Sequence, residues 1–340
     1  MKLTVKTIAD NLGVAPSTVS KIINKKGNFS DELRVKVLDY IKEVGYVPVS
    51  SARVLKSNKT WTIGIIYTEE THIGLEHPFF SSILQAFKDY VEVEGYDLSF
   101  IVHQIGQHHM SYLKWCKNKK VDGVLIVIGS HNNPDVIELA KSDIPCISTD
   151  VVRDDLHTVI SDNEQGMRLS IEYAMSLGIK NIGMIAGPLT AKHFLYRFKK
   201  YQEIIKENNL RYEDDWVIAA KGFNCGHGYD ATIKLLNRSK EKPELLLAGS
   251  DILAFGAIRA IQSLGLRVPE DIQVIGYDDI PFAEMYNPKL TTIRQNAKEI
   301  GVKAAKTLIA FIEDKNSSSS GLTRVPVELI VRETTKPLKN

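Results

Sequence analysis

The sequence predicts an α/β protein, with a small all-α domain at the N-terminus followed by two lobes of doubly wound parallel sheet. The first 55 or so residues show helical periodicity only, whereas from Trp61 onward short apolar runs alternate with amphipathic segments. Strands that alternate with helices form parallel sheets. Roughly 280 residues have this second pattern, which is too many for one comfortable sheet, so we expect two lobes.

Residues 4–24 have the pattern of a helix-turn-helix. Ile8, Ala9 and Leu12 form an apolar stripe at helical spacing, and Gly13 permits the conformation that ends a helix. Proline at position 16 suits the first turn of a second helix. Its outward side chains are short donors and one cation, as a helix in the major groove requires: Ser17, Thr18, Ser20, Lys21 and Asn24. A plain helical hairpin with a solvated polar face has the same short pattern.

A third helix is expected from Ser30, whose hydroxyl caps the first amides, to Gly45. Residues 51–56 are too few for a stable helix alone, and residues 57–60 form a polar linker. The predicted core strands are Thr62–Tyr67, Asp97–Val102, Gly123–Ile128, Cys146–Thr149, Asn181–Ala186, Trp216–Ala219, Glu244–Ala248, Gln273–Tyr277 and Val325–Val331. The predicted core helices are Phe79–Glu94, Glu164–Leu177, Phe194–Asn208, Gly228–Leu236, Ile252–Leu264 and Ala297–Glu313.

Charge is distributed unevenly along the chain. Residues 1–59 hold 11 Lys and Arg against five Asp and Glu, whereas the whole chain holds 43 against 41. A basic segment on a mildly acidic body is typical of a protein that binds nucleic acid through that segment. The sequence has no apolar signal region and no run near the ~20 residues of a membrane span, and its three cysteines are isolated. We therefore expect a cytoplasmic protein with no membrane partner.

Two motifs of enzymes and metal sites are weak here. Residues 226–231 mimic a dinucleotide-binding fingerprint, but they lie mid-chain without a convincing acidic residue after a following strand. His103, His108, His109 and Cys116 have no usual zinc spacing. We expect no catalytic residues, no metal and no cofactor.

Many short segments together resemble the LacI/GalR (lactose-repressor) family of bacterial transcription regulators, nearly from end to end. They are Thr7–Ala9, Gly13–Val14, Ser17–Asn24, Gly45–Pro48, Ala52–Leu55, His77–Phe80, Val121–Val124, Val274–Pro281, Leu290–Gln295 and Val327–Thr334. The resemblance implies three parts: a helix-turn-helix domain (1–48), a hinge helix and linker (49–60), and an effector-binding core like periplasmic binding proteins (61–340). Crossings near residues 161, 290 and 322 would divide the core into lobe 1 (about 61–161 and 291–322) and lobe 2 (about 162–290 and 323–340).

The resemblance also implies DNA-binding residues. Ser17 and Lys21 match base-reading positions, and Leu55, with Ala52 beside it, matches a hinge leucine that wedges into the minor groove. The positions that match phosphate contacts are Thr4, Thr18, Ser20, Asn24, Ser30 and Tyr46. Lys21 stands where arginine is commoner, and it lacks arginine's planar fork for guanine. This departure, with Pro16 and Val49, bears on which operator is read.

On the effector side, the residues that match or neighbour family positions are Phe79, Phe80, Asp150, Lys192, His193, Phe223, Ser250, Asp278 and Gln295. Aromatic rings suit the C–H face of a sugar, and carboxylates accept hydrogen bonds from hydroxyls. Leu195 lies where sugar binders of this lineage often have arginine, and Ser250 where they have asparagine. Core packing of the three phenylalanines, and a role for Asp278 in bracing a turn, are the alternatives.

We expect the protein to be a DNA-binding transcriptional regulator that acts as a repressor. Its homodimer would read a near-palindromic operator, and a small molecule, a sugar or derivative, would control the operator affinity. The alternatives are a pure small-molecule binding protein and an α/β enzyme with an appended headpiece. Operator binding distinguishes the regulator from the first alternative, and ligand binding without turnover distinguishes it from the second.

Lys21→Ala should weaken specific DNA binding more than non-specific binding, by roughly 1–3 kcal/mol, because a base-reading cation contributes only on the correct sequence. Titration of operator and random DNA at one salt concentration measures both affinities. An equal loss on both would make Lys21 a phosphate contact instead.

Overall fold

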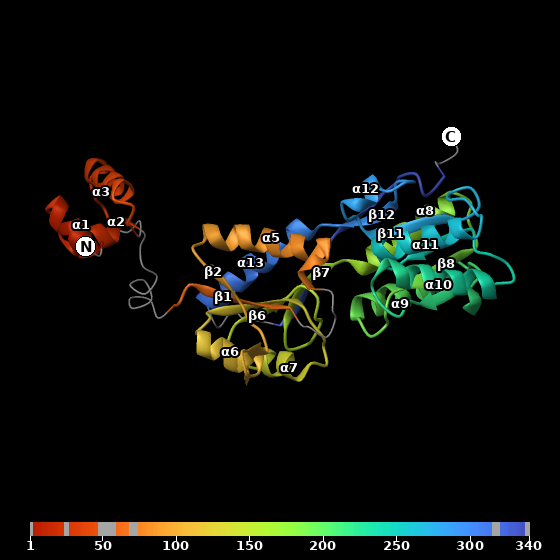
Figure 1. Cartoon of the computed structure of the whole chain (residues 1–340), viewed down its shortest axis with the longest axis horizontal. Coiled ribbons are helices and arrows are strands. Elements are labelled where there is room, and N and C mark those ends of the chain that lie inside the picture. Colours follow the sequence, from red (N-terminus) through yellow and green to blue (C-terminus); the bar gives the residue numbers. More distant parts are fainter. Residues whose placement is uncertain (1–2, 24–26, 47–58, 68–73, 315–319, 337–340) are drawn as a thin grey trace. The chain divides into compact units, whose positions relative to one another are not determined.

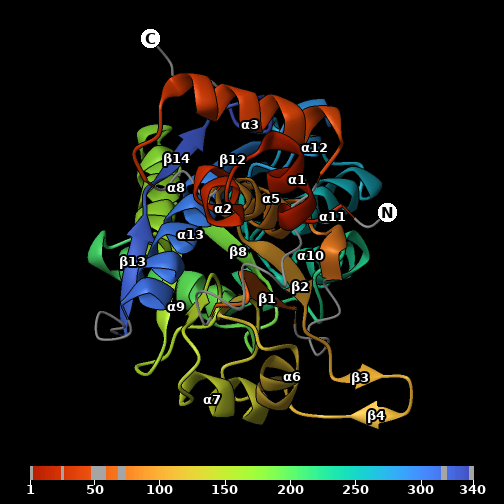
Figure 2. The ribbon, with the colours of Figure 1, turned by 90° about the vertical axis from the view of Figure 1, so that its left-hand side faces the viewer.

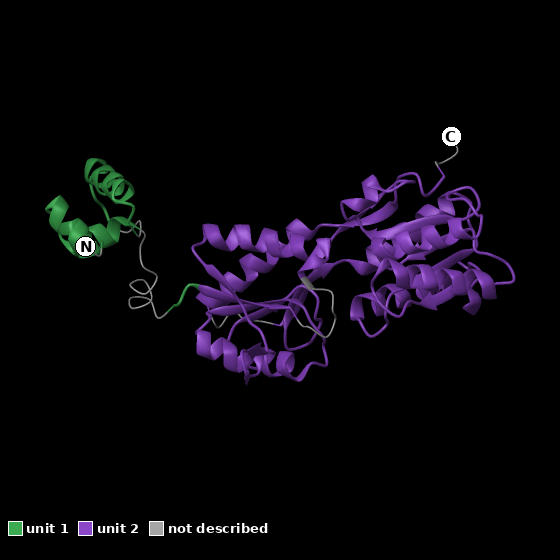
Figure 3. Ribbon diagram, viewed as in Figure 1, with its two compact units in different colours: residues 1–61 green, residues 62–340 purple. Residues whose placement is uncertain are grey.

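The computed structural model describes residues 3–23, 27–46, 59–67, 74–314 and 320–336. The chain forms two compact units, residues 1–61 and 62–340 (Figure 3). The predicted hinge helix, with Ala52 and Leu55, and the predicted phosphate contact Asn24 lie outside the described residues. Among the helices that are described, none has both the length and the apolar character needed to cross a bilayer.

The first unit contains three helices, α1 (Val5–Leu12), α2 (Pro16–Ile23) and α3 (Asp31–Glu43). Thr4 caps α1 through the amide of Thr7, and Ser30 caps α3 through the amide of Leu33. Gly13, at φ 67°, ends α1, as the sequence predicts. The apolar stripes meet in a small core made of Ile8, Ala9, Val19, Ile22, Val37 and Tyr46. The predicted helix-turn-helix is therefore present, with α2 as its second helix.

Lobe 1 of the second unit is a six-stranded sheet in the order β13-β7-β6-β5-β1-β2, with every pair parallel. Helices α5 and α13 cover one face, and α6 and α7 cover the other (Figure 1). Its elements are β1 (Thr62–Tyr67), η2 (Gly74–Glu76), α5 (Pro78–Val93), β2 (Asp97–Phe100), β3 (Gln104–Ile105), β4 (His108–His109), α6 (Tyr112–Lys119), β5 (Gly123–Ile128), α7 (Pro134–Ala140), β6 (Cys146–Ser148), β7 (His157–Ser161), α13 (Ala297–Glu313) and β13 (Gly321–Val325).

Lobe 2 is a second six-stranded sheet, in the order β14-β12-β11-β10-β8-β9, in which only the edge pair β12–β14 is antiparallel. Helices α8 and α9 pack together on one face, and α10 and α11 on the other. Its elements are α8 (Asn163–Ser176), β8 (Ile182–Ala186), α9 (Lys192–Glu207), η3 (Asp214–Trp216), β9 (Val217–Ala219), α10 (Cys225–Arg238), β10 (Leu245–Ala248), α11 (Asp251–Ser263), β11 (Gln273–Asp278), α12 (Phe282–Met285), β12 (Thr291–Gln295) and β14 (Val327–Ile330).

The chain crosses between the lobes three times, at Asp162, Asn296 and Pro326. The first crossing lies beside the expected position 161. The second follows residue 295 rather than 290, because β12 pairs with β11 and so belongs to lobe 2. The third lies at Pro326 rather than 322, because β13 pairs with β7 in lobe 1.

The expected strand Val325–Val331 is wrong in one respect, since its first residue ends β13 and the remainder lies in the other lobe as β14. Proline at position 326 lacks the N–H that a continuous ladder needs, so the two strands separate there. The sequence pattern does not predict β7 or β12. Their sequences, HTVIS in β7 and TTIRQ in β12, are too polar to indicate buried strands.

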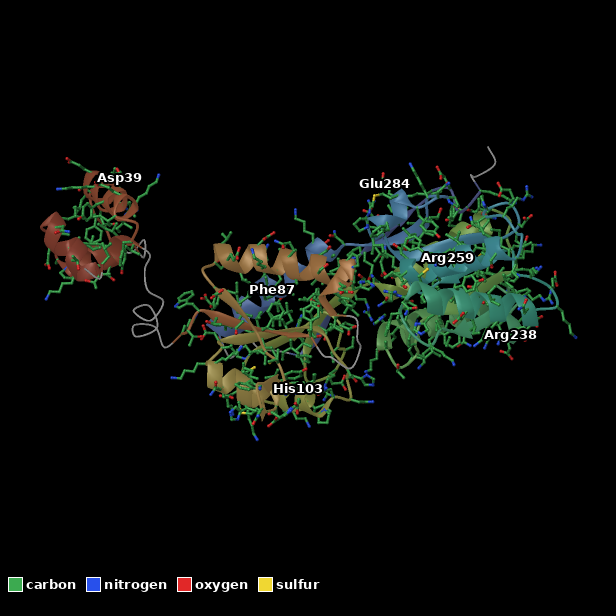
Figure 4. The ribbon with its side chains drawn as sticks, in the orientation of Figure 1. Asp39, Phe87, His103, Arg238, Arg259 and Glu284 are labelled. Carbon is green, nitrogen blue, oxygen red and sulfur yellow. The ribbon has the colours of Figure 1, made fainter. Side chains whose placement is uncertain are left out.

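One small hairpin departs from the layered plan. Strands β3 and β4 pair with each other and extend from lobe 1 (Figure 2). At the base of this hairpin, His103 Nδ1 lies 3.1 Å from Asp135 Oδ2 and its ring stacks on Tyr112, beside α6 and α7 (Figure 4). His108 and His109 are exposed on the hairpin itself. Within the described parts of the chain, no group of His, Cys, Asp and Glu is arranged to hold a metal.

One glycine of the weak dinucleotide-like motif, Gly228, has a packing role. Helices α10 and α11 cross closely at Gly228 and Gly256, where an added methyl group would collide with backbone atoms of the facing helix. On Gly256 it would meet the carbonyl of Cys225, and on Gly228 the carbonyl of Leu253. Gly228 therefore serves helix packing in lobe 2.

Gly256→Ala should lower the free energy of unfolding of lobe 2 by about 1–3 kcal/mol, because backbone atoms at the crossing cannot move aside cheaply. Gly226→Ala, on α10, is the matched control. Its methyl group would meet only the Asn224 side chain, at 3.3 Å. Urea unfolding followed by Trp216 fluorescence compares the two. Equal midpoints would contradict the close crossing.

Candidate effector site and DNA-binding surface

Four of the predicted DNA-binding residues lie on α2. Ser17 and Lys21 are exposed on α2, and Thr18 and Ser20 are half-buried there. Thr4 and Ser30 occupy helix N-caps with exposed side chains, next to amides that a phosphate could also approach. Tyr46 is buried, and its ring packs in the three-helix core.

The candidate effector site is a cavity between the two lobes of the second unit. All nine residues expected from the sequence line it, although they come from segments far apart in the chain. Lobe 1 contributes Phe79, Phe80 and Asp150, and lobe 2 contributes Lys192, His193, Phe223, Ser250, Asp278 and Gln295. Most follow the carboxyl ends of parallel strands, which is where open α/β sheets bind ligands. The sheet topology therefore brings them together.

Aromatic rings line part of this cavity. Phe79 and Phe80 lie in the first turn of α5, with ring centroids 5.1 Å apart. Phe80 is buried, whereas Phe79 and Phe223 are half-buried. Phe223 packs against Phe194 of α9, with centroids 5.6 Å apart. These rings thus belong to the core edge and the cavity wall at once.

A buried polar network forms the lobe 2 side of the cavity. Gln295 donates to Asp278 at 2.6 Å, and both side chains are buried. Arg197 of α9 is buried as well. Its Nε donates to Asn163 at 2.8 Å, one terminal nitrogen donates to the carbonyl of Gly249 at 2.6 Å, and the same nitrogen lies 4.0 Å from Asp278. A buried charge persists only when it is paired in this way.

Arg197 corrects one expectation from the sequence. Leu195 is half-buried outside the cavity lining, and an arginine two residues further along the same helix lines the cavity. Side chains two residues apart on a helix point about 200° away from each other. Only one of residues 195 and 197 can therefore face the cavity. The cavity thus contains an arginine, although it is not at position 195. Ser250 lines the cavity and also caps α11 through the amide of Leu253.

Two contacts join the lobes directly at the edge of the cavity. His193 Nδ1 lies 3.3 Å from Asp150 Oδ1, and the Lys192 ammonium donates to the carbonyl of Val152 at 3.1 Å. The other oxygen of Asp150 accepts from the amide of Gly129 at 3.2 Å. Lys192 and His193 start helix α9 in lobe 2, so this helix end closes the cavity against lobe 1.

Some lining residues were not expected from the sequence. They are His77, Thr149, Val152, Ile160, Ser161, Asn163, Phe194, Tyr196 and Arg197. Among the described side chains, Ser161 Oγ and His77 Nδ1 are buried without a hydrogen-bond partner. Burial, followed by the nearby charges of His193 and Arg197, lowers the pKa of His77 to about 4. Ser161 and Asn163 flank the first crossing, and that position was the signal that could have identified them.

Two carboxyl groups are buried behind the cavity. Asp251, the first residue of α11, accepts from the amide of Ile280 at 2.9 Å and from the hydroxyl of Thr292 at 2.5 Å. Burial, and to a smaller extent the negative charge of the neighbouring Asp278, raises the pKa of Asp251 to about 8. Burial also raises the pKa of Asp278, while Arg197 opposes that rise. Asp278 is therefore the one of the pair that is better placed to carry a charge.

Two family profiles match the chain. Residues 4–49 match "Bacterial regulatory proteins, lacI family", and residues 171–335 match "Periplasmic binding protein-like domain". A relative from Pasteurella multocida (strain Pm70), named HTH-type transcriptional repressor PurR, is 34% identical over 98% of this chain and 98% of its own length. A repressor of the same name from Haemophilus influenzae (strain ATCC 51907 / DSM 11121 / KW20 / Rd) is 32% identical, covering 98% and 99%. This chain belongs to the LacI family of bacterial regulatory proteins.

Solved structures of LacI-family proteins have the same architecture. The lac repressor dimer bound to operator and the anti-inducer ONPF aligns with a TM-score of 0.77 and 26% identity, covering 98% of this chain and 99% of that one. A LacI family regulator from Enterococcus faecium with bound ribose gives 0.68 and 26%, covering 82% and 100%. The regulator CelR in complex with cellobiose gives 0.71 and 25%, covering 98% and 100%. The chain is thus a transcriptional regulator with a DNA-binding headpiece and an effector-binding core.

The buried Asp251 should make the stability of this regulator fall as pH rises. Its native pKa is raised to about 8, against about 4 in an unfolded chain. The native state thus binds the proton more tightly, and stability declines between those values. Asp251→Asn should flatten this decline.

Melting temperatures between about pH 5 and pH 8 test the idea, with Asp230→Asn on exposed α10 as the matched control. The control should retain the wild-type slope. An unchanged slope in Asp251→Asn would show that another group carries the pH dependence.

Proposed function

We propose that this LacI-family regulator is a repressor that binds operator DNA as a homodimer and responds to a small polyhydroxylated effector, a sugar or a sugar derivative. One observation carries the effector proposal. Nine residues chosen from the sequence, on separate strand and helix ends, converge on a single cavity between the lobes. An enclosed site with aromatic walls and a few placed polar groups is the usual form of a small-molecule site.

The chemistry of the cavity suits hydroxyl groups. Asp278 and Asp150 supply carboxylate acceptors, and Arg197 supplies guanidinium donors in a fixed plane. Neighbouring hydroxyls on a sugar ring both donate and accept, so they fit such mixed walls. Phe79 and Phe223 supply apolar surface for the C–H face of the ring. The ribose and cellobiose complexes of the two similar regulators support the same ligand class.

The DNA side of the proposal rests on the first unit. The exposed Ser17 and Lys21 on α2 are assigned to base edges. The phosphate contacts are assigned to Thr4, Thr18, Ser20, Asn24, Ser30 and Tyr46, and the minor-groove contacts to Ala52 and Leu55. The basic composition of residues 1–59 supplies the sequence-independent attraction to phosphates. One such headpiece per protomer gives two half-sites, hence a near-palindromic operator.

The homodimer is supported by an apolar surface on lobe 2. Phe282 and Met285 of α12 are 60% and 69% exposed, and Tyr286 beside them stacks on Phe255 at 4.6 Å. Glu284 lies on the same short helix (Figure 4). Large exposed apolar side chains in a group mark association surfaces. The similar lac repressor was solved as a dimer on its operator.

Effector and operator are proposed to communicate through the angle between the lobes. The effector contacts both lobes, so it binds one inter-lobe angle better than another, and it shifts the population accordingly. A coupling free energy of about 1–3 kcal/mol between the two sites is typical. A change in the angle between the lobes would break and re-form the contacts of Lys192 and His193 with lobe 1.

Asp278→Asn should weaken effector binding at least tenfold and remove most of the effect of the effector on operator affinity, because a charged acceptor contributes about 1.5–3 kcal/mol. The measurement is operator binding by fluorescence anisotropy, with and without the sugar identified by a thermal-shift screen. A sugar at 100 times its dissociation constant adds roughly 2.7 kcal/mol of apparent stability.

Asp230→Asn, the same change on the exposed face of α10, is the control and should respond to the sugar as the wild type does. A full response in a folded Asp278→Asn protein would reject the assignment of Asp278. A screen in which no sugar or sugar derivative binds would reject the effector class.

A further inference from the structure

A second cavity adjoins the proposed effector cavity and shares one wall with it. The shared wall consists of Asp150, Lys192, His193 and Phe223. The second cavity has a volume of about 210 Å³, and the first has about 50 Å³. One enclosed water needs about 10–15 Å³ on this measure, so the first cavity holds only a few waters. A sugar ring therefore needs more room than the first cavity offers, and the shared wall separates it from the larger cavity.

That wall is formed by the two side chains that cross between the lobes. The Lys192 ammonium reaches the carbonyl of Val152, and the His193 ring reaches Asp150. The Lys192 contact joins a cation to a neutral carbonyl, and the His193 contact is long, at 3.3 Å. A ligand that offered a better partner to Lys192 would join the two cavities into one site.

The second cavity is rich in donors and cations. Besides Lys192 and His193, its lining includes His131 and the hydroxyls of Ser130 and Thr190. Its carboxylate, Asp150, is already engaged by the amide of Gly129 and by His193. In the described part of the chain, Lys192 makes no ion pair, and its contact is with the neutral carbonyl of Val152.

Positively charged side chains lie in and beside this cavity. Burial lowers the pKa of His131, and the charges of Lys192 and Arg153 lower it further, with Asp150 acting against them. Arg153 is fixed beside the cavity, because it pairs with Asp155 at 2.7 Å and donates to the carbonyl of His131 at 2.9 Å. Helix α9 also begins here, at Ala191, which provides no side-chain cap for the amides of the first turn. The ammonium of Lys192 and the uncapped start of α9 both favour an anion.

We propose that the effector is a phosphorylated sugar, whose ring occupies the first cavity and whose phosphate occupies the second. Lys192 exchanges the carbonyl of Val152 for a phosphate oxygen, and His131 donates from the opposite lobe. The exchange is favoured because a phosphate oxygen is negatively charged, whereas the carbonyl that it replaces is neutral. The phosphate then links α9 of lobe 2 to the segment after β5 in lobe 1. This inference rests on the proposed sugar-binding function of the first cavity.

The test compares neutral sugars with their phosphates on the full-length protein. Ribose, ribose 5-phosphate, glucose, glucose 6-phosphate and inorganic phosphate are titrated by isothermal calorimetry at one ionic strength. At least one sugar phosphate should bind about tenfold or more tightly than its neutral sugar, and inorganic phosphate should bind far more weakly. Neutral sugars that bind as well as or better than their phosphates would overturn the inference and leave the proposed function standing. No binding by any sugar or sugar phosphate would overturn both.

Substitutions in the lining of the second cavity test whether the phosphate binds there. Lys192→Gln and His131→Gln should each reduce the affinity ratio of phosphorylated to neutral sugar by about tenfold. Lys206→Gln, the same change in the exposed last turn of α9, should leave the ratio unchanged. A ratio that survives in both test variants, or that falls equally in Lys206→Gln, would place the phosphate elsewhere and overturn the assignment.

Discussion

The buried guanidinium of Arg197 is the interaction on which the cavity side of lobe 2 depends. It binds Asn163 at the start of α8, the carbonyl of Gly249 at the end of β10, and approaches Asp278 at the end of β11. Its carbon also lies 3.5 Å from the centre of the Tyr277 ring. A buried cation requires compensation from every side. By satisfying that requirement, the chain fixes three otherwise independent loops in one geometry.

Much of this arrangement follows from sequence pattern. The helix-turn-helix, the alternation of strands and helices, and the meeting of distant strand ends at one cleft all depend on local periodicity and on the topology of parallel sheets. Phe79, Asp150 and Gln295 lie in one cavity for that reason. The resemblance to the family identifies the individual effector-site residues. The alternation of strands and helices by itself identifies only the strand ends at which such residues would lie.

The remainder could not be predicted because it depends on tertiary contacts. Arg197 reads as a surface cation of an amphipathic helix until its burial is known. Three of the five residues of β12 are threonine or glutamine, and it is a strand because β11 and β14 pair with it on both sides. His131 and Lys192 are separated by 60 residues, and only the approach of the two lobes makes them neighbours of one cavity. Residues 47–58, which include most of the predicted hinge and linker (49–60), lie outside the described residues.

The crossings between the lobes are each one residue long, at Asp162, Asn296 and Pro326. Two of them are tied side by side, since the amide of Asp162 donates to the carbonyl of Val325 at 2.8 Å. Connections of one residue have no spare length. One added residue at Pro326 would shift the register of β14 and turn its buried face outward. The lobes can therefore rotate about these joints, yet the joints cannot change in length. Insertions, which surface loops tolerate, would be selected against here, and diversity among such regulators would accumulate in the cavity walls instead.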